Sequence, residues 1–95
     1  MEYTIDCAGI SSKEELHDIL AETLHFPAHY GANLDALHDC LGEISQKTHL
    51  ILLNWDHAAA FARGFHFVFN DAEHVCPNLL ITIRWCKGVL QNTCN

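Results

Sequence analysis

Basic residues are scarce in this sequence. Five Lys and Arg stand against twelve Asp and Glu, and the formal net charge is −7. No Lys or Arg lies between Glu14 and Gln46. Because nucleic acids and anionic membranes are bound through clustered Lys and Arg, we expect neither as a partner. An acidic chain of this kind favours a basic protein, which it meets quickly through long-range steering.

Features of secreted and membrane proteins are also missing. No apolar run approaches the ~20 residues that a membrane-spanning helix requires. The first ten residues, MEYTIDCAGI, have neither the basic nor the apolar region of a signal peptide. The five cysteines are an odd number without CxxC spacing. In a chain without a secretion signal they indicate reduced thiols, and we expect a cytoplasmic protein.

Motifs of common enzymes do not occur. There is no Gly-rich phosphate loop, no Gly-x-Ser-x-Gly and no HExxH. The residues His38, Asp39 and Cys40 include the types found in thiol enzymes, but neighbours on a helix point in different directions. Cys40 also leans toward the apolar side, where a thiol is inert. We therefore expect no catalytic residues and no enzyme activity.

A metal site is a further alternative, because eight histidines accompany the five cysteines. His25 and His29 are four residues apart, but Pro27 between them prevents a shared helical face. His74 and Cys76 are close in sequence, yet no second pair has zinc-finger spacing. We therefore expect no metal and no cofactor, which metal analysis of the purified protein would test.

The apolar pattern predicts one small α/β domain. Nearly half of the 95 residues are apolar, enough for a single modest core. Strands are expected at 3–7, 50–53 and 79–83, the second covered on both faces because it is continuously apolar. Helices are expected after a capping box at Ser12, after Asn33, and after a cap at Asp56. The last helix is long, and a break at Gly64 is one alternative, since Gly costs about 1 kcal/mol relative to Ala.

Alternating strands and helices favour parallel pairing with right-handed crossovers. The prediction is a small three-stranded parallel sheet packed against helices. The domain is expected at 1–85. A loose tail is expected at 86–95, where no periodicity is present.

The stretch 26–41, FPAHYGANLDALHDCL, predicts a loop that turns at Tyr30-Gly31 and a helix capped by Asn33. At about 100° per residue, one side of this helix gathers apolar residues, namely Leu34, Leu37, Leu41 and Ile44. The opposite side carries the carboxylates Asp35, Asp39 and Glu43. No basic residue nearby in sequence neutralises these carboxylates.

This row of carboxylates is either a solvated face or a docking face. Like charges at i, i+4 destabilise a helix by roughly 0.2–0.5 kcal/mol per pair. Asp35 lies in the first turn, where the helix dipole favours an acid, whereas Asp39 and Glu43 meet the dipole unfavourably. Gly42 could end the helix and leave Glu43 outside the row. The residues alone leave both alternatives open.

The stretch Tyr30 to Leu37, YGANLDAL, followed by Asp39 and Leu41, resembles the barstar family, the intracellular inhibitors of secreted barnase-type ribonucleases. Leu16, His17 and Pro27 agree with the family as well. The resemblance weakens beyond Gly42, where it rests on the expected strands and the later helix.

The resemblance implies a cytoplasmic, non-catalytic inhibitor that binds a basic barnase-like ribonuclease in a 1:1 complex. The acidic helix and the preceding loop would plug the nuclease active site, with carboxylates in place of RNA phosphates. A barstar-like acidic module that binds another basic protein, without ribonuclease inhibition, is the alternative that stays open.

Carried over residue by residue, the resemblance implies that Asp35 and Asp39 are the anchors. The other expected partner-binding residues are Gly31, Asn33, Leu34, Ala36, His29, His38, Gly42, Glu43 and Asp71. Asn33 has a structural role as a helix cap in any case, and Asp71 is equally consistent with a solvated helix surface. His29 and His38 stand where the family has Tyr and Trp, so partner identity is the least transferable part.

His38 adds a hypothesis about pH. The neighbouring Asp35 and Asp39 would favour its charged form, and acidification would then partly neutralise the docking face. Complex affinity measured between about pH 5 and 8, the range natural to histidine, tests this hypothesis.

Overall fold

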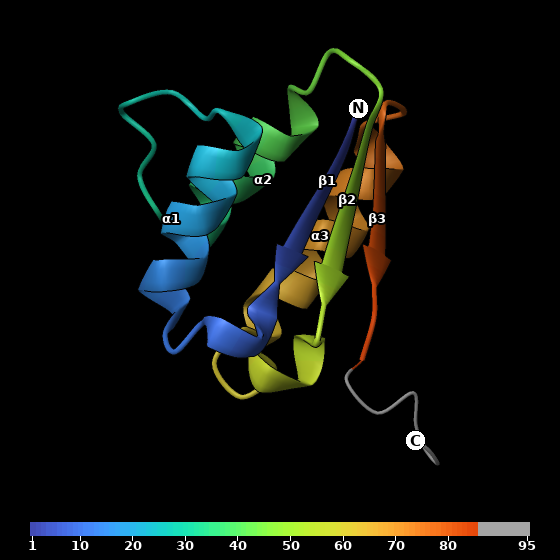
Figure 1. Cartoon of the computed structure of the whole chain (residues 1–95). Helices are drawn as coiled ribbons and strands as arrows, with labels where there is room; N and C mark the ends of the chain where they lie inside the picture. The colour runs from blue at the N-terminus through green and yellow to red at the C-terminus, as the bar shows by residue number, and fades with distance from the viewer. Residues whose placement is uncertain (86–95) are drawn as a thin grey trace.

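The computed structural model describes residues 1–85 as an α/β fold (Figure 1). The three strands are β1 (Glu2–Asp6), β2 (Thr48–Leu53) and β3 (Leu79–Ile83). They form one sheet in the order β1-β2-β3, with both pairs parallel. The helices are α1 (Lys13–Leu24), α2 (Leu34–Gly42) and α3 (Arg63–Val75), and the short 3-10 turns are η1 (Cys7–Gly9) and η2 (Trp55–His57). The predicted three-stranded parallel sheet is confirmed, and the tail expected at 86–95 lies outside the described residues.

Helix α1 begins with the predicted capping box. The Ser12 hydroxyl accepts a hydrogen bond from the Glu15 N–H at 3.2 Å, and the Glu15 carboxylate accepts one from the Ser11 N–H at 2.8 Å. The bonds from Ser11 lower the pKa of Glu15. The helix ends at His25, whose φ of 59° lies in the left-handed region, so the chain leaves α1 sharply just before Pro27.

All three helices contribute to one core on one face of the sheet. Figure 1 shows α3 passing behind the strands. Two right-handed crossovers in a sheet of sequential strand order place their helices on the same face. The fully buried side chains of this core include Leu16, Leu20, Leu37, Leu41, Leu50, Leu52 and Phe69.

The expectation that β2 is covered on both faces is wrong. Leu50 and Leu52 are fully buried, but Ile51 and Leu53, which point to the other face, are only partly buried. On the same outer face, Leu80 of β3 is exposed. The apolar run in β2 therefore reflects one helix-covered face and one partly open face, a distinction that hydropathy does not make.

The start of the last helix also differs from the prediction. Asp56 lies inside η2, and α3 begins only at Arg63, after Ala62, which makes no side-chain cap. The break in the helical region therefore precedes Gly64, which lies in the first turn of α3. A Cβ at Gly64 would come within 2.5 Å of Leu34 Cδ1, so glycine allows α3 to pack closely against the start of α2.

Cysteines in the described part of the chain are free thiols, namely Cys7, Cys40 and Cys76. Burial raises the pKa of Cys7 to about 11, and burial also raises the pKa of Cys40. Both thiols are therefore protonated at neutral pH and are poor nucleophiles. No helix formed by residues 1–85 is long and apolar enough to cross a membrane.

Candidate functional site

Helix α2 separates its apolar and acidic residues as predicted. Leu37 and Leu41 are fully buried, whereas Asp35 and Asp39 are exposed on the opposite side. Leu34, at the first turn, is 36% exposed, so it belongs to the edge of the core and not to its centre. Among residues 1–85, neither Asp35 nor Asp39 forms an ion pair with Lys or Arg. Their charge is therefore available to a partner.

The acidic row is shorter than the sequence spacing of Asp35, Asp39 and Glu43 predicted. Gly42 is the last residue of α2, and Glu43 caps the helix through its N–H, which bonds the Cys40 carbonyl at 3.3 Å. Glu43 is exposed, but it follows the helix instead of continuing the face of Asp35 and Asp39. Glu43 therefore lies outside the row, as the alternative expected, but Gly42 is the last residue of the helix and does not follow it as a left-handed cap. Ile44 lies beyond the helix and is partly buried.

The loop before α2 is fastened to the body of the protein through Tyr30. The Tyr30 Oη and the His17 Nδ1 lie 2.6 Å apart, and the His17 ring packs 4.7 Å from Phe65. Burial lowers the pKa of His17 and raises that of Tyr30 to about 12. A neutral imidazole can accept a hydrogen bond from the phenol O–H at Nδ1. Burial and this hydrogen bond therefore both favour the neutral forms of His17 and Tyr30.

The remainder of the loop is shaped by local bonds. Tyr30 N–H bonds the Pro27 carbonyl at 3.0 Å, and the residue with a left-handed φ is Ala32, at 51°. The turn thus lies at 27–30, before the predicted Tyr30-Gly31. The Asn33 side chain accepts a hydrogen bond from the Ala36 N–H at 2.8 Å, which confirms the predicted cap. A Cβ at Gly31 would meet the Asn33 Nδ2 at 3.1 Å, so glycine keeps this corner tight.

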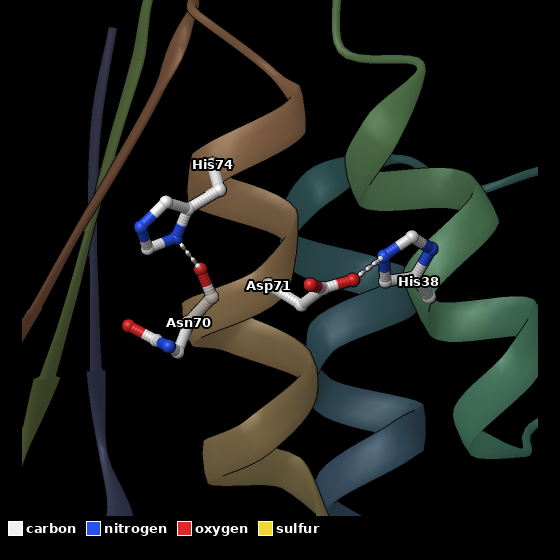
Figure 2. Close-up of polar contacts among 4 residues, drawn as sticks. All are labelled: His38, Asn70, Asp71 and His74. Atoms are coloured by element: carbon white, nitrogen blue, oxygen red, sulfur yellow. Dashed lines mark hydrogen bonds and ion pairs between the residues drawn. The ribbon is translucent and has the colours of Figure 1, made fainter.

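Asp71 joins the acidic face from another helix. Figure 2 shows the His38 ring of α2 and the Asp71 carboxylate of α3 pointing toward each other. Their Nε2 and Oδ2 atoms lie 2.7 Å apart, and the side chains are 35% and 67% exposed. His74, on the same helix as Asp71, instead bonds the Asn70 carbonyl at 2.8 Å and points away from His38 (Figure 2). Asp71 is therefore more than an isolated surface carboxylate.

We give the name acidic face to the candidate residues of α2, of the loop before it and of α3. It comprises the exposed side of α2, the loop before it and one position of α3, namely Asp35, Asp39, His38, Ala36, Leu34, Asn33, Gly31, His29 and Asp71. Gly42 and Glu43 lie at the opposite end of α2. Within the described residues, no group of three or more His, Cys, Asp and Glu side chains could hold a metal ion.

Sequence reasoning did not identify two contacts that support this surface. The His17–Tyr30 bond joins residues 13 positions apart, and the His38–Asp71 bond joins residues 33 positions apart. Both pairs depend on how α1, α2 and α3 pack, so no local pattern signals them. The occurrence of His17 and Tyr30 among the family-like residues was the only available indication.

Comparisons with known proteins agree with the resemblance seen in the sequence. The family model described as "Barstar (barnase inhibitor)" matches residues 1–80. A Bacillus subtilis (strain 168) protein named "Putative ribonuclease inhibitor YrdF" is 43% identical over 62 residues, which are 64% of this chain and 68% of that protein. Proteins of this family are non-enzymatic inhibitors, which confirms the expectation that the chain is not an enzyme. The resemblance seen in the sequence is also confirmed, and the chain belongs to the barstar family.

Proposed function

We propose that this protein inhibits a basic barnase-type ribonuclease by inserting the acidic face into the nuclease active site, in a 1:1 complex inside the cell that makes both. The observation that carries the proposal is that Asp35 and Asp39 are exposed and unpaired with Lys or Arg of residues 1–85. They project from a helix whose other side is anchored by Leu37 and Leu41.

The chemistry matches what a ribonuclease active site binds. A cleft that holds RNA phosphates is lined with cationic groups, and a carboxylate offers them oxygen acceptors in place of a phosphate. Hydrogen bonds between such charged groups are about twice as strong as neutral ones. Because α2 is backed by buried leucines and capped by Asn33, little ordering entropy is lost on binding.

Asp35 and Asp39 are the anchors in this proposal, and the other residues surround them. Gly31, Asn33, Leu34 and Ala36 lie at the start of α2, where they would exclude water from the charge pairs. Asp71 and His38 extend the contact toward α3. Glu43, with Gly42, would lie at the other end of the contact.

An RNA-cleavage assay with a panel of barnase-like and other guanyl-type nucleases tests the proposal directly. We expect one basic nuclease to be inhibited stoichiometrically, and Asp39→Ala to weaken the complex by about 2–5 kcal/mol. That range applies when one member of a buried interfacial charge pair is truncated, and the barnase–barstar complex is the standard example. Glu22→Ala, which removes an exposed carboxylate of α1, is the matched control and should leave binding unchanged.

Two outcomes would contradict the proposal. Full inhibition by Asp39→Ala would place the contact on another surface. Failure to inhibit any nuclease of the panel, combined with Asp39-dependent binding to a different basic protein, would establish the alternative of a barstar-like module with another target.

A further inference from the structure

An exposed aromatic side chain lies beside the acidic face. Phe67 of α3 is 75% exposed, and no large apolar residue among 1–85 is more exposed. Single apolar residues on a surface are common, but Phe67 is not alone. It lines an open groove of about 430 Å³ between α2 and α3, together with Leu34, Val68, Asn70, Asp35, His38 and Asp71.

Both apolar and acidic side chains line this groove. Phe67, Leu34 and Val68 provide the apolar surface, and Asp35 and Asp71 provide two carboxylates. His38 bonds only the Oδ2 of Asp71, so within residues 1–85 the Oδ1 of Asp71 has no hydrogen-bond partner. The side chain that fits must therefore offer both an apolar surface and positive charge.

Resting on the function proposed above, we propose that this groove binds an arginine side chain of the ribonuclease, with Phe67 as the platform on which the guanidinium stacks. The planar guanidinium binds aromatic faces and carboxylates at the same time, and its three-carbon stem covers apolar surface. A purely apolar side chain would bury the two carboxylates without partners, which is unfavourable. A lysine would bring the charge but not the planar group that stacks.

The first experiment measures the affinity of Phe67 variants for the nuclease that the panel assay identifies. We expect Phe67→Ala to weaken the complex roughly tenfold, within the range known for cation–π contacts, and Phe67→Tyr to keep most of the affinity. Leu80→Ala is the matched control, because Leu80 is also a large exposed apolar residue but lies on β3. Thermal melts should show all three variants folded, since neither side chain is buried.

The second experiment identifies the arginine on the nuclease. Each surface arginine of the nuclease is replaced by lysine, and a double-mutant cycle with Phe67→Leu is measured for each replacement. We expect one arginine to couple to Phe67. For that arginine, the fold loss of affinity in the double variant should be smaller than the product of the two single losses, by a factor of about three or more. The remaining arginines should show no coupling.

The outcomes separate this inference from the proposed function. If Asp39→Ala abolishes tight binding while Phe67→Ala behaves like Leu80→Ala, the groove is not a contact and the inhibitor function stands. If Phe67→Ala weakens binding but no arginine couples to it, the assignment of the occupant is wrong. If no nuclease is bound, the proposed function fails and this inference fails with it.

Discussion

Helices α1 and α2 each bury two leucines completely and expose a row of carboxylates, yet they differ in what surrounds those carboxylates. The exposed carboxylates of α1 are Glu14, Asp18 and Glu22, while the half-buried Glu15 bonds Ser11 and completes the cap of its own helix. Within residues 1–85, the exposed acids of both helices form no hydrogen bond or ion pair, so the difference lies in the segments beside them. A tethered loop precedes α2, and α3 adds Asp71 beside it. Acidic patterning is thus common to both helices, and the proposal that α2 is the docking surface depends on the neighbouring segments that converge on it.

The largest expected effect is a loss of stability, and it should be similar for substitutions in the buried side of either helix. Leu37→Ala in α2 and Leu20→Ala in α1 each remove a side chain with no exposed area. We expect each to lower the free energy of unfolding by about 2–5 kcal/mol, through lost burial and the cavity left behind. Urea denaturation measures both. A loss below 1 kcal/mol at either position would mean that this helix is not held by its leucines.

Tyr30→Phe should affect the α2 side of the comparison alone. It removes the phenolic hydroxyl and leaves the buried His17 Nδ1 without its partner, which should cost about 1–3 kcal/mol of unfolding free energy. Affinity for the nuclease should fall as well, because the loop before α2 loses its tether. Tyr3→Phe is the control, since the Tyr3 hydroxyl makes only an exposed contact with Met1 at 3.4 Å. Equal effects of the two substitutions would contradict a special role of Tyr30.

The two N-caps should separate stability from binding. The side chains of Ser12 and Asn33 each accept a backbone N–H at the start of a helix, so Ser12→Ala and Asn33→Ala should each cost about 1 kcal/mol of stability. Only Asn33→Ala should also weaken the nuclease complex, because Asn33 lies in the acidic face. Calorimetric titration of both variants measures this difference. If both variants kept full affinity, Asn33 would serve as a cap and nothing more.

The smallest effect near neutral pH concerns His17. Burial lowers its pKa below the ordinary value of 6.5, while Asp18 and Glu14 act more weakly in the opposite direction. Below pH 6.5 the unfolded chain therefore binds a proton that the folded chain does not, and stability should decrease as the pH falls toward the folded pKa. Unfolding followed between pH 8 and 5 measures this slope.

Substitutions locate the origin of that slope. His17→Gln should remove part of it, whereas His66→Gln, which changes an exposed imidazole of α3, should leave it intact. The same slope in the wild type and in His17→Gln would assign the pH dependence to other groups.

Local patterns predicted a large part of this molecule. The capping box at Ser12, the cap at Asn33 and the strand at 79–83 all involve bonds or periodicity within a few residues. The start of α3 was not predictable in this way, because Asp56 has the residue type of a cap but lies in η2. Nor was the role of Gly64 apparent, since it depends on the approach of Leu34, 30 positions earlier in the sequence.

The sequence by itself determined that this is a small acidic α/β domain with a leucine-backed helix that carries a row of carboxylates, because charge, periodicity and capping act over single turns. Only the tertiary structure decided which residues share the acidic face. His38 meets Asp71, Tyr30 meets His17, and Phe67 reaches the groove beside Asp35. These contacts follow from right-handed crossovers that stack three helices on one face of a parallel sheet. They join residues far apart in the sequence, so no local pattern within one helix predicts them.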